Sequence, residues 1–167
     1  MPSVTEIIDS HGLINEFSKQ EFAALRGSMV HLAARYFLEG RLDFASLDDR
    51  IVPYIQSLQQ WVMLTGFVAT ECEARRYHPL LKFAGTMDCV GVLPNNSTFI
   101  LDLKSGVPER WHGLQLAAYL ILYGGYRRRG GLYLQKDGSM AEFREYDDPA
   151  DAANFISCLN CYRLRER

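Results

Sequence analysis

The sequence has no long hydrophobic run. None of its apolar stretches reaches the roughly 20 residues that a membrane-spanning helix needs. The first ten residues, MPSVTEIIDS, have neither the basic start nor the apolar stretch of a secretory signal peptide. These absences predict a cytoplasmic protein that has no membrane partner.

Cysteine is also scarce, with four in the chain. Cys158 and Cys161 form a CxxC pair, but no second pair lies elsewhere to complete a tetrahedral zinc site. Cys72 and Cys89 fall within predicted strands, where a small buried thiol packs well. Disulfides are not expected in a reducing compartment, and a metal cluster bound by all four cysteines is the weaker alternative.

The chain has no strong excess of positive charge. Its 18 Lys and Arg residues against 20 Asp and Glu residues give a net charge of −2, so the protein as a whole is not a polyanion binder. Nucleic-acid contacts must come from local arginine clusters at residues 75–76 and 127–129 and in the C-terminal tail. Each cluster could instead be a solvated surface, and for the tail we favour that interpretation.

The chain contains no internal repeat, low-complexity segment or linker. Its 167 residues, 48% of them hydrophobic, are enough for one domain with a proper core and too few for a second sizeable domain, so we expect a single domain over residues 1–167. Periodicity and turn residues predict an α/β fold in which helices flank a mixed central sheet. The helices are expected at residues 18–39, 47–65, 111–124 and 149–163, and the strands at 67–77, 83–93, 97–104, 131–136 and 140–146.

The most informative segment is FAGTMDCVGVLPNNSTFILDLKSG, residues 83–106. Asp102 and Lys104 are two apart at the end of a predicted strand, so their side chains share a face, roughly 6–7 Å apart. Leu101 and Leu103 point to the opposite face. Asp88 lies in the preceding apolar run. Charged groups are costly there unless a metal or substrate satisfies them, so the segment indicates a metal-dependent phosphodiesterase site on a hairpin.

These residues belong to a longer pattern that resembles the PD-(D/E)XK nuclease superfamily. The similar branch contains the nuclease domains of recombination helicase–nucleases, the CRISPR-associated exonucleases and the mitochondrial genome-maintenance exonucleases. The resemblance covers about residues 27–136. Its elements, in order, are GSMVH ending in His31, Glu73 on the first strand, GTMD ending in Asp88, DLK from Asp102 to Lys104, and QxxxY from Gln115 to Tyr119.

The resemblance implies a restriction-endonuclease-like core and a Mg²⁺- or Mn²⁺-dependent deoxyribonuclease. Asp88 and Asp102 would be catalytic metal ligands, joined by the backbone carbonyl of Leu103 and by His31, and Lys104 would be the catalytic lysine. Carboxylates suit Mg²⁺, and an imidazole nitrogen favours Mn²⁺. A bound divalent metal lowers the pKa of water and offsets charge on the phosphate, and a lysine stabilises developing charge.

The resemblance also gives Glu73, Gln115 and Tyr119 a supporting or nucleic-acid-binding role. Glu71 could replace Glu73, because alternate residues of a strand share a face. Gln115 and Tyr119, four apart, share a helix face, although Gln115 could equally face solvent. Trp111 could stack on a splayed base or pack on the sheet.

Two departures from the pattern matter. Asp102 stands where glutamate is commoner, a change that the chemistry tolerates because both side chains are carboxylate ligands. Iron–sulfur members of the branch place one cysteine before the histidine helix and three near the C-terminus. Here no cysteine precedes Cys72, which argues against an iron–sulfur cluster. The chain is also too short for a helicase motor, so a helicase or recombination protein would be a separate partner.

We therefore expect an exonuclease that acts on single-stranded DNA or duplex ends in bacterial or phage recombination and repair. Two alternatives stay open. One is a module on a nuclease fold that binds nucleic acid or a partner protein and cleaves little. The other is a restriction-type endonuclease. Taken singly, these residues could also have no role in a site: Asp102 and Lys104 could form a surface pair, and His31 could be an exposed helical histidine.

Overall fold

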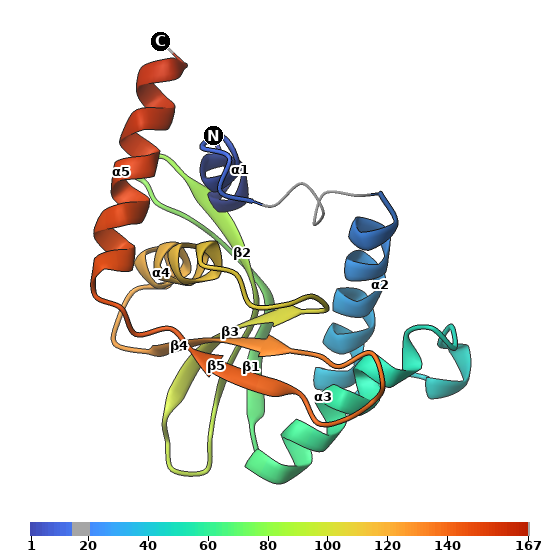
Figure 1. Ribbon diagram of the computed structural model, residues 1–167. Helices are drawn as coiled ribbons and strands as arrows, with labels where there is room; N and C mark the ends of the chain where they lie inside the picture. The colour runs from blue at the N-terminus through green and yellow to red at the C-terminus, as the bar shows by residue number, and fades with distance from the viewer. Residues whose placement is uncertain (15–20, 167) are drawn as a thin grey trace.

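The computed structural model describes residues 1–14 and 21–166 (Figure 1). Five strands form one sheet in the order β1-β2-β3-β4-β5. Neighbouring strands are antiparallel except for β3 and β4, which are parallel. The predicted α/β fold with a mixed sheet is therefore confirmed. The strand bounds are β1 Val68–Tyr77, β2 Ala84–Val92, β3 Thr98–Lys104, β4 Arg128–Tyr133 and β5 Glu142–Glu145.

Helices cover both faces of this sheet (Figure 1). The helix bounds are α1 Val4–Asp9, α2 Glu21–Leu38, the 3₁₀ turn η2 Phe44–Ser46, α3 Val52–Thr65, α4 Trp111–Tyr123 and α5 Ala150–Arg165. Helices α1, α4 and α5 share one hydrophobic core with the sheet, and α2 and α3 share the other. No helix within residues 1–14 and 21–166 is both long and apolar enough to cross a membrane.

Side-chain alternation along β3 divides the two cores as expected. Leu101 and Leu103 pack in the core beneath α2 and α3, whereas Ile100 packs in the core beneath α4. Lys104 also reaches α4, where its Nζ donates to Gln115. The charged residues of the strand therefore face the same helix, which is the arrangement that period-two alternation predicts.

One helix was not predicted, and some predicted bounds differ from the structure. Helix α1 was not predicted, because it has only six residues and is held by a capping box between Ser3 and Glu6. Helix α3 begins at Val52 rather than at residue 47, because residues 47–51 form a turn in which Asp48 accepts the backbone N–H groups of Arg50 and Ile51. Pro53 lies in its first turn, as expected. Strand β4 begins three residues early, at Arg128, because its parallel pairing with β3 sets its bounds.

Candidate active site

Asp88 occupies the point on β2 where pairing with β3 ends. The β2–β3 ladder runs from Val92–Thr98 to Cys89–Leu101. One residue further along β2, the Asp88 Oδ2 atom accepts the N–H of Leu103 at 2.7 Å. The carboxylate thus takes the place of a backbone partner. Because the N–H and C=O of a strand residue point to the same edge, the Leu103 carbonyl faces the same gap as the carboxylate.

His31 approaches Asp88 from helix α2. Its Nδ1 atom lies 3.3 Å from Asp88 Oδ1, and 31% of the His31 side chain is exposed against 11% of the Asp88 side chain. The negative charge of Asp88 raises the pKa of His31 to about 9. Burial alone would raise the pKa of Asp88, but the His31 charge and the Leu103 N–H outweigh burial and lower it. His31 is therefore a partner of the site rather than a free surface histidine.

Asp102 and Lys104 form a buried ion pair on β3. Asp102 is 2% exposed, and its Oδ2 atom lies 2.5 Å from Lys104 Nζ. Among the described residues that oxygen has no partner of hydrogen-bond geometry, so the lysine charge is its partner. Burial is the main reason that the pKa of Asp102 is raised, to about 6, and the nearby charge of Asp88 adds to the rise. The interpretation as a solvated surface pair is wrong.

Helix α4 supplies the groups that hold Lys104 from the other side. The Lys104 Nζ atom donates to Gln115 Oε1 at 2.9 Å. Gln115 Nε2 in turn donates to Tyr119 OH at 3.0 Å and reaches Thr5 Oγ1 of α1 at 3.5 Å. Gln115 and Tyr119 are both 5% exposed, so they share one face and neither faces solvent. Thr5 was not singled out from the sequence.

A network of aromatic side chains lies beneath the lysine. The Lys104 ammonium sits 4.8 Å from the ring centroid of Trp111, which is packed rather than free to stack on a base. The Nδ1 atom of the next residue, His112, accepts the backbone N–H of residue 109, so the Tyr133 hydroxyl donates to it at 2.7 Å. Tyr146 OH lies 2.6 Å from Tyr133 OH. Sequence periodicity gave no signal for these two tyrosines.

Burial also changes the ionisation of His112. The side chain is 2% exposed, and this burial lowers its pKa to about 3, with the Lys104 charge as a second cause. His112 is therefore neutral at physiological pH, which is the state in which its Nδ1 atom can accept.

Glu73 and Glu71 do not share a face. Glu73 lies between the Cys72–Cys89 and Ala74–Met87 pairs, opposite Asp88, and its φ of 51° breaks the alternation of β1. A non-glycine residue in this region costs on the order of 1 kcal/mol. The Glu71 carboxylate instead pairs with Arg76 at 2.6 Å and accepts from Tyr123. Only Glu73 therefore remains beside Asp88.

The donor set fits a divalent cation in type. Two buried carboxylates on neighbouring strands repel each other, which a divalent cation would offset. His31 Nδ1 lies 3.3 Å from Asp88 Oδ1, so an imidazole nitrogen is at hand beside the carboxylate and could serve as a ligand once deprotonated. Within residues 1–14 and 21–166, no three His, Cys, Asp or Glu side chains are grouped to hold one metal ion. Because Lys104 already pairs with Asp102, a bound metal would compete with the lysine for that carboxylate.

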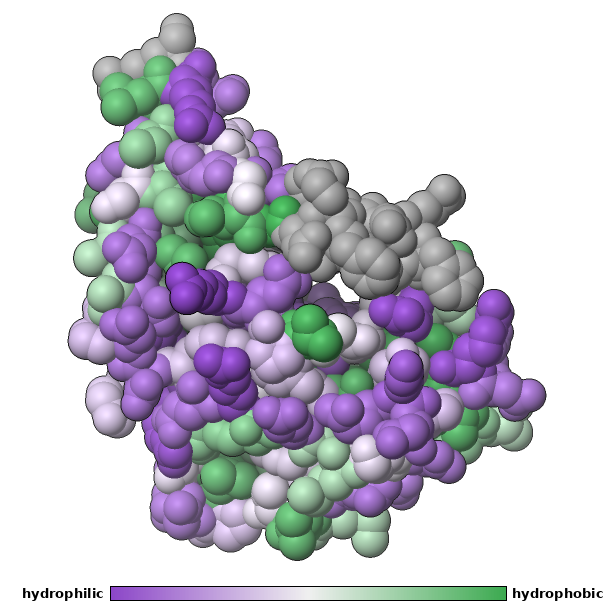
Figure 2. Space-filling model, viewed as in Figure 1, coloured by the Kyte–Doolittle hydropathy of each residue, from purple (hydrophilic) through white to green (hydrophobic). Residues whose placement is uncertain are grey.

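A cavity of about 360 Å³ adjoins these residues. Tyr119 forms part of its wall, and Thr86 precedes Asp88 by two positions on β2. Arg75 and Arg76 contribute positive charge from β1. Hydrophilic side chains also border a hollow on the face between α1 and α2 (Figure 2). Positive charge from β1 and the candidate residue Tyr119 therefore meet at one cavity.

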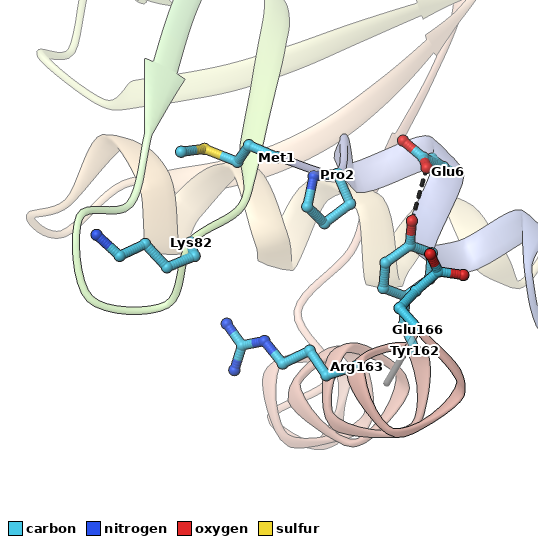
Figure 3. A pocket seen from close by; sticks show the side chains of 7 residues that line it. All are labelled: Met1, Pro2, Glu6, Lys82, Tyr162, Arg163 and Glu166. Atoms are coloured by element: carbon cyan, nitrogen blue, oxygen red, sulfur yellow. Dashed lines mark hydrogen bonds between the residues drawn. The ribbon is translucent and has the colours of Figure 1, made fainter.

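A larger cavity, of about 510 Å³, contains none of the candidate site residues. It lies between the N-terminus, the β1–β2 loop and α5, and Figure 3 shows Lys82 and Arg163 on its wall. Arg163 donates to the Leu81 carbonyl, and Tyr162 OH donates to Glu6 at 2.7 Å. Arg163 thus connects α5 to the β1–β2 loop.

Comparison with solved structures identifies the class of fold. The chain superposes on a protein from Eubacterium rectale to which exonuclease activity has been ascribed, with a TM-score of 0.63, 12% identity, and coverage of 98% of this chain and 78% of that one. It also superposes on LHK-Exo, an alkaline exonuclease from Laribacter hongkongensis, in complex with dAMP. There the TM-score is 0.53, the identity 16%, and the coverage 98% and 86%.

No family model and no curated protein matches the chain. At these identities the likeness establishes the fold. The chain therefore has an α/β fold with a restriction-endonuclease-like core, the fold of these nucleases.

Proposed function

We propose that this chain is a divalent-metal-dependent deoxyribonuclease that hydrolyses phosphodiester bonds. The observation that carries the proposal is the convergence of Asp88 from the middle of β2, the Asp102–Lys104 pair at the end of β3 and Gln115 of α4, on a fold shared with exonucleases. Buried ionised side chains of both signs are costly to keep in a core, so their convergence favours chemistry over architecture.

Asp88, Asp102, the Leu103 carbonyl and His31 would hold the metal. When bound, a divalent ion supplies a water of lowered pKa and offsets charge on the scissile phosphate. Lys104 is fixed by Asp102 and Gln115 beside the carboxylates, where its ammonium would stabilise negative charge on the phosphate.

Tyr119 and Glu73 would support the site by holding other groups in position. Tyr119 orients the amide of Gln115, so that its oxygen faces Lys104. Glu73 faces Asp88 across the strand pair and supports the same side of the site. DNA would reach the carboxylates through the cavity that Arg75 and Thr86 line, because cationic side chains attract the phosphate backbone.

The finer proposal is an exonuclease that acts on single strands or duplex ends in bacterial or phage recombination and repair. The similarity to LHK-Exo and to the Eubacterium rectale protein supports it. A helicase or recombination protein would be a separate partner.

The test is cleavage of end-labelled DNA, single- and double-stranded, linear and circular, with Mg²⁺, Mn²⁺ or EDTA. We expect metal-dependent loss of linear substrate that spares circles, and no cleavage by Lys104→Ala. Lys136→Ala, which changes an exposed lysine, is the matched control and should cleave normally. Cutting of circles would reassign the protein as an endonuclease. Binding without cleavage in either metal would leave a nucleic-acid-binding module.

A further inference from the structure

Cys72 and Cys89 are directly opposite each other on neighbouring antiparallel strands. They form one of the register pairs of β1 and β2, and both thiols are free. Opposite Cα atoms in an antiparallel pair lie about 4.5–5.5 Å apart, inside the range of about 4.4–6.8 Å that disulfides span. The backbone therefore already has the spacing that a cross-strand disulfide needs.

The two side chains also meet. Both side chains pack in the core beneath α2 and α3, so the two thiols lie on the same face of the strand pair. Cys72 is half-buried, whereas Cys89 is 0% exposed. A small oxidant can therefore reach Cys72, and Cys89 lies behind it as the resolving thiol.

We propose that Cys72 and Cys89 form a reversible disulfide when the protein meets hydrogen peroxide. The Cys72 sulfur attacks a peroxide oxygen, the O–O bond breaks, and Cys72 becomes a sulfenic acid as one water leaves. The Cys89 sulfur then attacks the Cys72 sulfur, and the S–O bond breaks as a second water carries away the thiol proton. Two thiols are oxidised and one peroxide is reduced to two waters. A dithiol reverses the bond by exchange.

The disulfide would act on the candidate site through Asp88. Opposite Cβ atoms in a sheet are about 4.5–5.5 Å apart, and a disulfide draws them to about 3.8 Å. Asp88 immediately precedes Cys89, and Glu73 immediately follows Cys72. Closing the pair shifts the Asp88 carboxylate away from its contacts with His31 and Leu103. A displacement of about 1 Å at a reactive group costs up to about 100-fold in rate.

This inference has two parts. Formation of the disulfide depends only on the strand register. Its effect on cleavage rests on the proposed nuclease function. In a reducing compartment the thiols are free at rest, so the oxidised form is a transient one.

The test uses the full chain with Cys158→Ser and Cys161→Ser, so that Cys72 and Cys89 are the only thiols left. Hydrogen peroxide is added, free thiols are alkylated, and the intact mass and peptide map are measured. We expect loss of both free thiols, a mass lower by two hydrogen atoms, a peptide that joins residues 72 and 89, and full reversal by dithiothreitol. The inference is overturned if Cys89 stays alkylatable while Cys72 is oxidised, or if Cys72 links two chains.

The second arm measures DNA cleavage before oxidation, after oxidation and after reduction. We expect oxidation to lower the rate by at least about tenfold, with dithiothreitol restoring it. Cys72→Ser in the same background should cleave normally and resist the peroxide. A disulfide that forms without changing cleavage overturns the regulatory part. A disulfide in a protein that never cleaves DNA contradicts the proposed function and leaves the modification standing.

Discussion

Lys104 is held in place by neighbours of three kinds. Asp102 supplies a charge, Gln115 a hydrogen-bond acceptor and Trp111 an aromatic face. Each contact comes from a residue that is at most 8% exposed. A long side chain with several rotatable bonds is thereby kept in one position, which an electrostatic catalyst needs, because a preorganised charge acts on the transition state without first having to reorganise.

Substituting Lys104 by Met should abolish cleavage and also destabilise the fold. The change leaves the buried Asp102 carboxylate without its cation, and breaking a buried pair in this way costs about 3–5 kcal/mol. Adding Asp102→Asn should recover most of that stability, because the uncompensated charge is gone, without restoring activity. Urea unfolding and the cleavage assay measure the two effects. A double variant no more stable than Lys104→Met would contradict the ion-pair argument.

His112 should make stability depend on pH. Its folded pKa of about 3 is below the ordinary value of 6.5, so below pH 6.5 the unfolded chain takes up a proton that the folded chain does not. Its contribution is therefore complete above pH 6.5 and is lost as the pH falls toward 3, at up to about 1.4 kcal/mol per pH unit.

His112→Gln keeps an acceptor for the Tyr133 hydroxyl but cannot titrate. Its free energy of unfolding, measured with urea at a series of pH values below 6.5, should fall less steeply than that of the wild type. Parallel slopes for the two proteins would show that the ring is not kept neutral by burial.

At the level of elements, features that depend on a strong local pattern were predicted correctly, whereas features that depend on strand pairing were not. The alternation of β3 and the four-residue spacing of Gln115 and Tyr119 are local, so the sequence alone predicted which residues share a face, although it left open whether Gln115 faces solvent. The start of β4 depends on its parallel partner β3, which is separated from it by a helix. The positive φ of Glu73 likewise follows from pairing with β2, and this is why Glu71 was wrongly expected to share its face.

The arginines at residues 127–129 illustrate the same limit. They read as one basic cluster, yet Arg129 is 8% exposed. It donates to the carbonyls of Gly113 and Asp148 at 2.8 and 2.7 Å and pairs with Asp151 at 3.1 Å, so it ties β4 to α4 and to the segment that enters α5. Arg128, one position earlier, makes an exposed pair with Glu145.

Adjacent substitutions can therefore separate a structural arginine from a surface one. Arg129→Met should lower the free energy of unfolding by about 3–5 kcal/mol, because a carboxylate and two carbonyls lose their donor. Arg128→Met should cost at most about 1 kcal/mol, as exposed ion pairs do. Chemical denaturation of both variants measures the difference. Equal losses would mean that Arg129 does not tie the helices to the sheet.

At the scale of the whole molecule, the proposed DNA binding has to overcome a net charge of −2. The chain offers local positive charge where the fold concentrates it. Arg75 and Arg76 line the cavity beside the candidate carboxylates, whereas Arg163 is engaged with the β1–β2 loop. Arg76 is partly neutralised by Glu71, so Arg75 is the cation of this cavity with the most charge to offer.

Arg75→Gln should weaken binding of single-stranded DNA to a similar degree for every sequence, because a phosphate contact carries no base information. Each phosphate contact releases counterions, so losing one should also reduce the slope of log affinity against log salt by about 0.7 for a single strand. Fluorescence anisotropy with labelled DNA in EDTA, at several salt concentrations, measures both quantities without cleavage. Arg165→Gln, which removes the same charge from the C-terminal tail, should leave the slope unchanged. Equal effects of the two substitutions would mean that only overall charge matters and that the cavity does not guide the strand.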